Sequence, residues 1–106
     1  MKPEIGRSYY ESGVVWYEEW LIKGQLHRET GPAYTLYYES GAVWYEEWFI
    51  KGQRHNTSGP AYIRYYKSGA VEYEQWFIKG KRLDDNEIKE LKWKINFDKE
   101  VEEVLR

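Results

Sequence analysis

The chain repeats itself every 28 residues, and this period constrains its fold more than any other feature. A Ser-Gly pair, a tryptophan and a Lys-Gly pair recur at this spacing, starting at Ser12, Ser40 and Ser68, at Trp20, Trp48 and Trp76, and at Lys23, Lys51 and Lys79. Residues 31–58 and 59–86 are identical at 18 of 28 positions, and residues 9–30 match 37–58 at 16 of 22. A period of about 20–50 residues is typical of arrays in which one small unit stacks on copies of itself. We therefore predict one domain with repeats at 3–30, 31–58 and 59–83.

The composition is that of a small domain that lacks room for a large core. With 106 residues the chain buries a modest share of its surface, so its stability has to come from dense packing. Aromatic residues make up 19% of the chain, with 6 Trp and 11 Tyr, and each of them buries a large area. We expect the aromatic side chains to supply most of the packing.

Charge and cysteine content exclude several classes of protein. A net charge of −2 argues against direct binding to nucleic acid. The absence of cysteine excludes disulfides and thiolate metal sites and suits a cytoplasmic protein. Neither a signal-peptide pattern at the N-terminus nor a stretch of about 20 apolar residues is present, so no membrane association is expected.

Within each repeat the pattern predicts two strands joined by a tight turn. Residues 33–38 and 43–50 are rich in tyrosine, tryptophan and β-branched residues, and Ser40-Gly41 lies between them. The turn is either a two-residue type I′ loop or a three-residue loop with Gly41 in the left-handed conformation. The fold class is mainly β: an antiparallel meander of three repeated hairpins, about six strands in all, with a C-terminal helical cap.

Strict alternation of side chains along residues 43–50 predicts two apolar faces, each with one carboxylate. One face would carry Val43, Tyr45, Glu47 and Phe49, and the other Trp44, Glu46, Trp48 and Ile50. A single sheet with two apolar faces has to cover at least one of them.

The predicted cover is the tail at residues 84–106, where the repeat has ended. Ile88, Leu91 and Ile95 lie on one helical stripe, and residues 96–98 read as a break before a second stripe. Two short helices, or one kinked helix, would then lie on the last hairpin and seal the end of the array, with Trp93 in the seal.

Residues 37–52, which read YYESGAVWYEEWFIKG, resemble the variant MORN repeat, whose units form two strands around a Tyr-Tyr…Gly turn and end in Lys-Gly. The HRETGPA junction at 27–33 is similar to that of a longer subtype found in bacterial, phage and giant-virus proteins. The resemblance covers residues 8–83 and implies an extended sheet of hairpins used for protein contacts. Some bacterial members are labelled antitoxins, and small members from phage-like genomes suggest inhibitors of host defence proteins. The resemblance thus implies an antitoxin-like or anti-CRISPR-like inhibitor, with a bacterial defence nuclease or a toxin as its target.

The residues that could carry chemistry are few. Glu18, Glu46 and Glu74 share one position in three repeats, and paired carboxylates can do acid–base work, but a row of acids along a strand more often limits edge-to-edge aggregation. His27 and His55 are the only histidines, and we interpret them as loop residues that bond to backbone at the junctions rather than as metal ligands. We expect no enzymatic activity, no metal and no cofactor.

Differences between repeats indicate where a partner binds. Trp16 and Trp44 align with Glu72, and a position that accepts glutamate is expected to be reachable by water. Exposed aromatic residues ringed by charge are typical of interface hot spots. Alternatively, a neighbouring repeat or the tail covers the two tryptophans. The candidate protein-binding residues are Trp16, Trp44, Tyr37, Glu18, Glu46 and Glu72.

Three classes of function remain open. The aromatic sheet and the acidic side chains favour a non-enzymatic module that binds and inhibits another protein. A carbohydrate-binding module is the second class, because tryptophan and tyrosine platforms stack on sugars. The third is a self-associating scaffold, a homodimer formed through open sheet edges such as residues 5–10.

Overall fold

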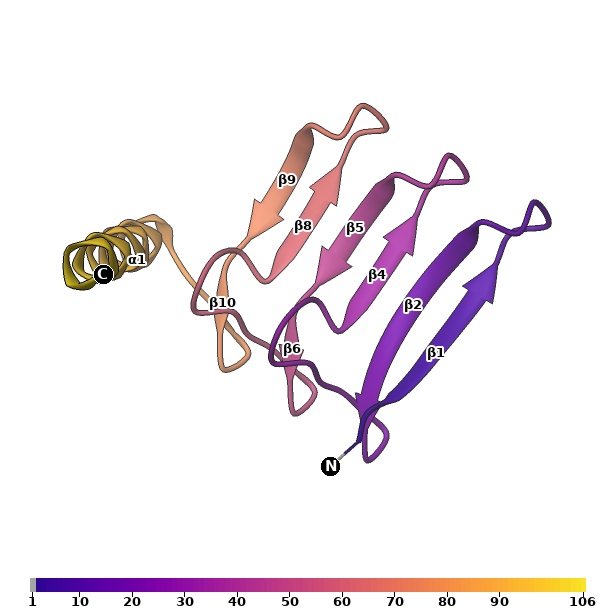
Figure 1. Cartoon of the computed structure of the whole chain (residues 1–106), viewed down its shortest axis with the longest axis horizontal. Coiled ribbons are helices and arrows are strands. Elements are labelled where there is room, and N and C mark those ends of the chain that lie inside the picture. Colours follow the sequence, from indigo (N-terminus) through magenta and orange to yellow (C-terminus); the bar gives the residue numbers. More distant parts are fainter. Residues whose placement is uncertain (1) are drawn as a thin grey trace.

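The tyrosine-rich segments pair into one antiparallel meander, and a single helix follows it (Figure 1). A computed structural model describes residues 2–106. The strands of the meander, in spatial order, are β1 (Glu4–Tyr9), β2 (Val15–Ile22), β4 (Tyr34–Tyr37), β5 (Val43–Glu47), β8 (Tyr62–Tyr65) and β9 (Val71–Gln75). Each hairpin pairs with the next one edge to edge, through β2 with β4 and β5 with β8. The predicted meander of three hairpins is confirmed.

The first turn of each repeat is the three-residue loop. In the middle repeat the Tyr38 N–H donates to the Ala42 carbonyl at 2.8 Å, and the Gly41 N–H donates to the Tyr38 carbonyl at 2.9 Å. Gly41 has φ of 93°, a left-handed conformation that glycine adopts at little cost. The type I′ alternative at this turn is therefore wrong.

A β-bulge follows this turn in every repeat. Leu36 is opposite Tyr45 and Tyr37 is opposite Val43, so Trp44 is an extra residue without a partner in the ladder. The same register shift leaves Trp16 and Glu72 unpaired in the other two repeats. Because a bulge interrupts the alternation of side chains, the predicted strict alternation along residues 43–50 is wrong at its first two positions, Val43 and Trp44.

The second turn of each repeat closes a short hairpin, which continues the main sheet in the first repeat and forms a separate two-stranded sheet in the other two. These hairpins are β2 with β3 (Gln25–Leu26), β6 (Phe49–Ile50) with β7 (Gln53–Arg54), and β10 (Phe77–Ile78) with β11 (Lys81–Arg82). In the middle repeat Lys51 and Gly52 have φ of 50° and 77°, as a two-residue type I′ loop requires.

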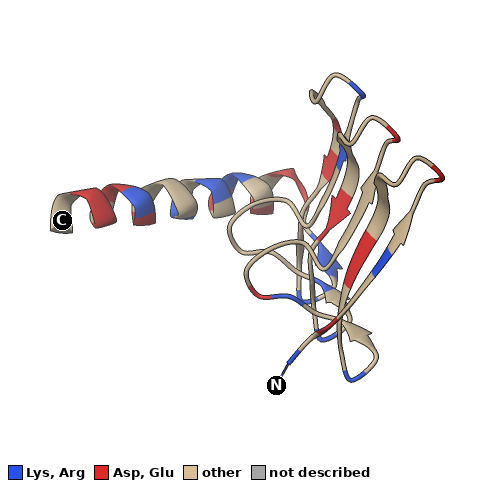
Figure 2. Ribbon diagram, turned by 45° about the vertical axis from the view of Figure 1, so that its right-hand side comes forward, with Lys and Arg blue, Asp and Glu red and all other residues tan. Residues whose placement is uncertain are grey.

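The junctions between repeats line one face of the sheet. Ala33 and Ala61 lie at the ends of these junctions and are fully buried, and Thr35 on the following strand is 6% exposed. The Arg28 guanidinium lies 3.9 Å from the centre of the Trp20 ring, which anchors the first junction to this face. The buried core is thus a thin row beneath the junctions, and the opposite face of the sheet has no such cover (Figure 2).

The tail forms one continuous helix, α1 (Asp85–Leu105), so the predicted break at residues 96–98 is wrong. Asp84 caps it: its carboxylate accepts from the Glu87 N–H at 2.9 Å, and the Glu87 side chain accepts from the Asp84 N–H. This capping box stabilises the first turn, and the regular pattern of helix-forming residues carries the helix across Asn96 without a stop signal.

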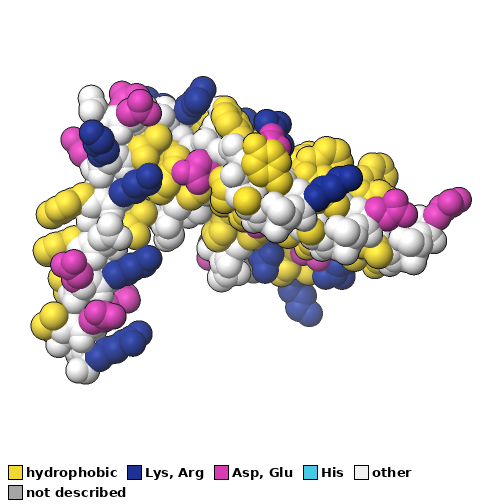
Figure 3. Space-filling view, turned by 90° about the horizontal axis from the view of Figure 1, so that it is seen from above, with side chains coloured by type: hydrophobic (Ala, Val, Ile, Leu, Met, Phe, Trp, Pro, Cys, Tyr) yellow, Lys and Arg dark blue, Asp and Glu magenta, His cyan; other side chains and the backbone are white. Residues whose placement is uncertain are grey.

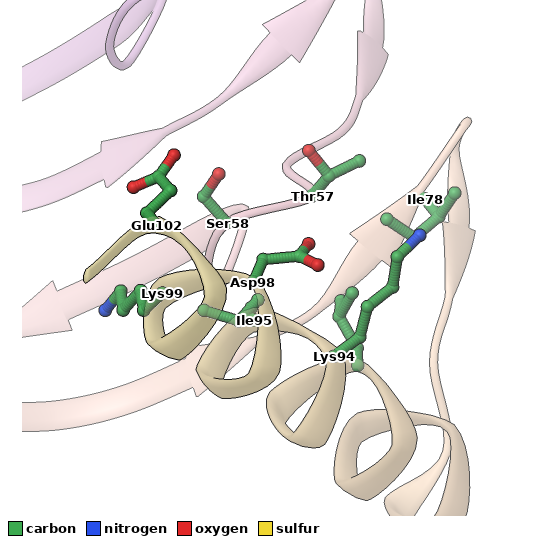
Figure 4. A pocket seen from close by; sticks show the side chains of 9 residues that line it. Thr57, Ser58, Ile78, Lys94, Ile95, Asp98, Lys99 and Glu102 are labelled. Carbon is green, nitrogen blue, oxygen red and sulfur yellow. The ribbon is translucent and has the colours of Figure 1, made fainter. Parts of the chain in front are cut away.

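α1 leaves the end of the array and projects away from the sheet, so it covers neither face (Figures 1 and 2). Leu91 and Ile95 are half-buried at the inner side of the helix, where an open cleft of about 580 Å³ separates it from Thr57 and Ser58 of the second junction (Figure 4). Trp93 is 66% exposed, so its predicted place in a seal over the last hairpin is wrong.

Candidate functional site

Five tyrosines form a ladder across the uncovered face of the sheet, which we call the tyrosine face. Its members are Tyr17, Tyr34, Tyr45, Tyr62 and Tyr73, one from each of the strands β2, β4, β5, β8 and β9. Consecutive ring centres are 5.8, 5.9, 5.6 and 6.1 Å apart, and the first two pairs are stacked. Because aromatic pairs in contact across strands stabilise a sheet, the ladder compensates for the thin core.

Packing within the ladder raises the pKa of two of its phenol groups. Burial, reinforced by neighbouring Tyr45, raises the pKa of Tyr34 to about 12, and burial likewise raises the pKa of Tyr45. Both phenols therefore stay neutral at physiological pH. Rings that stack on one another use their flat faces within the protein, so the ladder presents ring edges and hydroxyl groups outward.

Trp16 and Trp44 lie on the tyrosine face because of the bulge. Their rings are centred 5.2 and 6.5 Å from those of Tyr17 and Tyr45, the residues that follow them. Consecutive residues in a regular strand point to opposite faces, so contacts this short require both rings on one side. The two tryptophans are 44% and 38% exposed, which confirms that the position faces water and that the tail covers neither.

A tyrosine from the first turn of each repeat supports each tryptophan. Tyr38 stacks on Trp44 with ring centres 5.0 Å apart and planes 11° apart, and Tyr10 contacts Trp16 at 6.3 Å. The hydroxyl group of Tyr38 donates to the Tyr65 carbonyl at 2.8 Å, which ties this supporting ring to the next hairpin. The tryptophans are thus held in fixed orientations while part of each ring remains open to water.

The third repeat gives this face a charged end. Glu72 occupies the tryptophan position and accepts from the Arg64 Nε at 2.9 Å, while the guanidinium lies 5.4 Å from the Tyr73 ring centre. In the second repeat, the Arg54 guanidinium donates to the Glu47 carboxylate at 2.9 Å. The face therefore carries exposed tryptophans in the first two repeats and ion pairs in the second and third.

The other predicted site residues lie on the opposite face, which we call the junction face. Glu18 accepts hydrogen bonds from the Arg7 guanidinium at 2.7 Å and from the Trp20 indole at 2.8 Å. The indole N–H, together with the Arg7 guanidinium, holds the pKa of the Glu18 carboxyl group below its usual range. Glu46 accepts from the Tyr65 hydroxyl at 2.8 Å. The structure thus separates these two acids from the exposed tryptophans.

Tyr37 also lies on the junction face, since it is two residues from Thr35 on the same strand. It is half-buried, and burial raises the pKa of its phenol. Sequence reasoning grouped Tyr37, Glu18 and Glu46 with the tryptophans because the bulge was not foreseen. The residues that it missed are Tyr10, Tyr38 and the ladder, although the 28-residue recurrence of Tyr17, Tyr45 and Tyr73 is a signal that could have found them.

The described part of the chain does not gather metal-binding side chains: within residues 2–106, no three of His, Cys, Asp and Glu lie together in a group that could hold an ion. Among the same residues, no helix combines the length and apolar character needed to cross a bilayer. No family model, no curated protein and no solved structure matches the chain.

Proposed function

We propose that the chain is a non-enzymatic binding protein that docks its tyrosine face onto another protein and blocks it. The observation that carries the proposal is the exposure of Trp16 and Trp44 at equivalent bulge positions of successive repeats, each backed by a stacked or tilted tyrosine. Tryptophan and tyrosine dominate hot spots in protein interfaces, and rings that are already held in place lose little entropy on binding.

The arrangement of the rings favours a protein partner over a carbohydrate. A sugar stacks on an open ring face, but Tyr17, Tyr34 and Tyr45 turn their faces toward one another, and Tyr38 covers one face of Trp44. What remains outward is a mixture of ring edges, hydroxyl groups and ion pairs such as Arg54 with Glu47. This mixture is typical of an interface core with a polar rim.

The class of partner follows from the resemblance of residues 37–52 to the variant MORN repeat. It supports a bacterial defence nuclease or a toxin as the target, blocked in the cytoplasm by a small inhibitor. A basic group on such a target would complement the carboxylate of Glu19 on the tyrosine face, whereas Glu47 and Glu72 are already paired with Arg54 and Arg64.

The test first captures the partner from bacterial lysate on the immobilised full chain. The captured protein is then titrated with the wild type and with two variants, and both its binding and its remaining activity are measured. Trp16→Ala/Trp44→Ala should lose at least about thirtyfold in affinity, or about 2 kcal/mol, with blocking lost in proportion. Tyr9→Ala is the matched control, because Tyr9 is 58% exposed but pairs with Val15 away from the tyrosine face. Equal binding by the double variant and the wild type would refute the proposal.

A further inference from the structure

The outer half of α1 carries apolar side chains that nothing in residues 2–106 covers. Trp93, Phe97, Val101, Val104 and Leu105 are 66%, 49%, 39%, 82% and 80% exposed. Every residue from Asn96 to the end of the helix is exposed. A single exposed apolar residue is ordinary, but five on one helix form a surface that needs an explanation.

Four of these residues form a continuous line, which we call the outer stripe: Trp93, Phe97, Val101 and Val104. Their spacing of four, four and three residues places them on one side of a helix. The rings of Trp93 and Phe97 stack with centres 5.3 Å apart. The half-buried residues Leu91 and Ile95 lie on a different side, so the helix has two apolar sides and the body of the protein contacts one of them.

The outer stripe, which the body of the protein does not contact, also matters for the stability of α1. Residues 96–105 extend beyond the body, and an isolated helix shorter than about 12–15 residues is marginal in water. Most helical stability in proteins comes from packing of an apolar side. A partner on the outer stripe would supply that packing for the projecting half of α1.

We propose that the outer stripe binds the outer stripe of a second copy of this chain, with the two helices antiparallel. The charges along α1 favour this occupant. Between Ile88 and Ile95 three lysines, Lys89, Lys92 and Lys94, outnumber one acid, Glu90, and between Asn96 and Leu105 four acids outnumber one lysine, Lys99. Antiparallel pairing places the net basic segment of one helix beside the net acidic segment of the other, whereas parallel pairing places like segments together.

The charges that flank the outer stripe also match in detail. At about 100° per residue, Lys94 and Asp98 lie on one flank, and Lys89 and Glu103 lie on the other. In an antiparallel pair, equal flanks face each other. With the crossing point at Asn96, the residue before Phe97, Lys94 comes next to Asp98 of the second copy, and Lys89 comes next to Glu103 of the second copy. Two-fold symmetry repeats both contacts, as expected for an isologous dimer.

The shape of the protein leaves room for this contact. α1 projects from the sheet, and hydrophobic side chains line its outer side, away from the sheet (Figures 2 and 3). Antiparallel pairing through that side places the two sheets at opposite ends of the helix pair. Both tyrosine faces then remain open, so each copy keeps the surface assigned to its target.

Sedimentation of the full chain tests the association. We expect the wild type to sediment at twice its monomer mass of 12.9 kDa at about 100 μM, as small interfaces are weak, and to dissociate on dilution. Phe97→Glu should be monomeric at the same concentration, while Trp44→Ala, on the tyrosine face, should remain a dimer. A monomeric wild type, or a dimer that survives Phe97→Glu, would overturn the proposal.

Mixing of charge variants tests the orientation. Lys94→Glu and Asp98→Lys should each weaken the dimer at least about tenfold, because each places like charges next to each other across the helix pair. An equimolar mixture of the two variants should restore a heterodimer, since glutamate at 94 then meets lysine at 98. An effect of either substitution within its own helix would be the same in the mixture as in the separate variants. Failure of the mixture to associate would therefore contradict the antiparallel pair.

The absence of cysteine permits a second test of orientation. Phe97→Cys places a thiol near the proposed two-fold axis and should give a disulfide-linked dimer on mild oxidation, while Val104→Cys should not. Efficient cross-linking through position 104 as well as position 97 would indicate parallel helices and refute the proposed arrangement, because a parallel pair brings every stripe position next to its own copy.

Discussion

The Nδ1 atom of His27 accepts a 2.8 Å hydrogen bond from the backbone N–H of Lys51, the residue at the same turn of the next repeat. His55 accepts from the Lys79 N–H in the same way at 2.9 Å. The third repeat has Leu83 at this position, and no further repeat turn follows it. Histidine therefore occurs in the two repeats that are followed by another second turn, whose backbone N–H it accepts. This confirms the interpretation of His27 and His55 as junction residues that bond to backbone.

Replacement of His27 by alanine should loosen the first repeat from the second. The Lys51 N–H would lose its acceptor, and a hydrogen bond of this kind contributes about 0.5–1.5 kcal/mol to the free energy of unfolding. Urea unfolding followed by tryptophan fluorescence measures the change. His27→Asn is the control, because the asparagine Oδ1 reaches nearly the same place and should retain part of the stability. Equal losses in both variants would mean that the bond itself contributes little.

The two classes of tryptophan should respond differently to truncation. Trp76 is 6% exposed and has Lys92 of α1 over its ring, so Trp76→Ala should cost about 3–5 kcal/mol of unfolding free energy. Trp44→Ala should cost about 1 kcal/mol, since it removes one stacked pair from a ring that is already 38% exposed. Urea unfolding of the two variants side by side measures both. If Trp44→Ala is as unstable as Trp76→Ala, Trp44 is a core residue and not a binding residue.

The 28-residue period was sufficient to predict the meander, because repeated units of this size can bury their apolar sides only against one another. It also placed Trp16 and Trp44 at the surface, since Glu72 occupies the same position in the third repeat. The faces of the strands could not be predicted. They depend on the bulge after the first turn, and a bulge inserts one residue without a distinctive residue type.

The tail was harder to predict than the repeats. Its sequence contains two apolar stripes, and residues 84–106 alone do not show which of them contacts the sheet. Asn96 and Asp98 resemble a helix boundary, but a residue of modest helix propensity does not end a helix when both flanking segments are strong helix formers. Trp93 was assigned to the wrong stripe for the same reason, because large aromatic residues are usually buried and this one is not.

Removal of the cap of α1 should fray its first turn. Asp84→Ala deletes the carboxylate that accepts from the Glu87 N–H, and loss of such a cap typically costs about 1 kcal/mol. Hydrogen exchange of the backbone amides of residues 85–90 should accelerate while that of β5 is unchanged. Asp85→Ala is the matched control, since Asp85 lies in the first turn but does not accept the capping bond. Equal exchange in the two variants would assign the effect to charge and not to capping.

High pH should destabilise the fold through its buried phenols. Burial, with Tyr45 next, raises the pKa of Tyr34 to about 12, and burial followed by the hydrogen bond to Glu46 raises that of Tyr65 to about 12. An unfolded tyrosine titrates near 10, so the folded state holds these protons more tightly. The contribution is fully present below about pH 10 and is lost as the pH rises through the folded values. Urea unfolding from pH 8 to 12 should therefore show stability that falls above about pH 10.

The ladder and the junction face should contribute separately to this alkaline loss. Tyr65→Phe removes the phenol that donates to Glu46, and Tyr34→Phe removes one from the ladder, so each variant should have a shallower decline in stability with pH than the wild type. Tyr66→Phe is the control, because Tyr66 is 52% exposed, and it should leave the slope unchanged. Absorbance at the phenolate band should show two fewer late-titrating groups in Tyr34→Phe/Tyr65→Phe. If this double variant declines as steeply as the wild type, ionisation of other groups drives the alkaline unfolding.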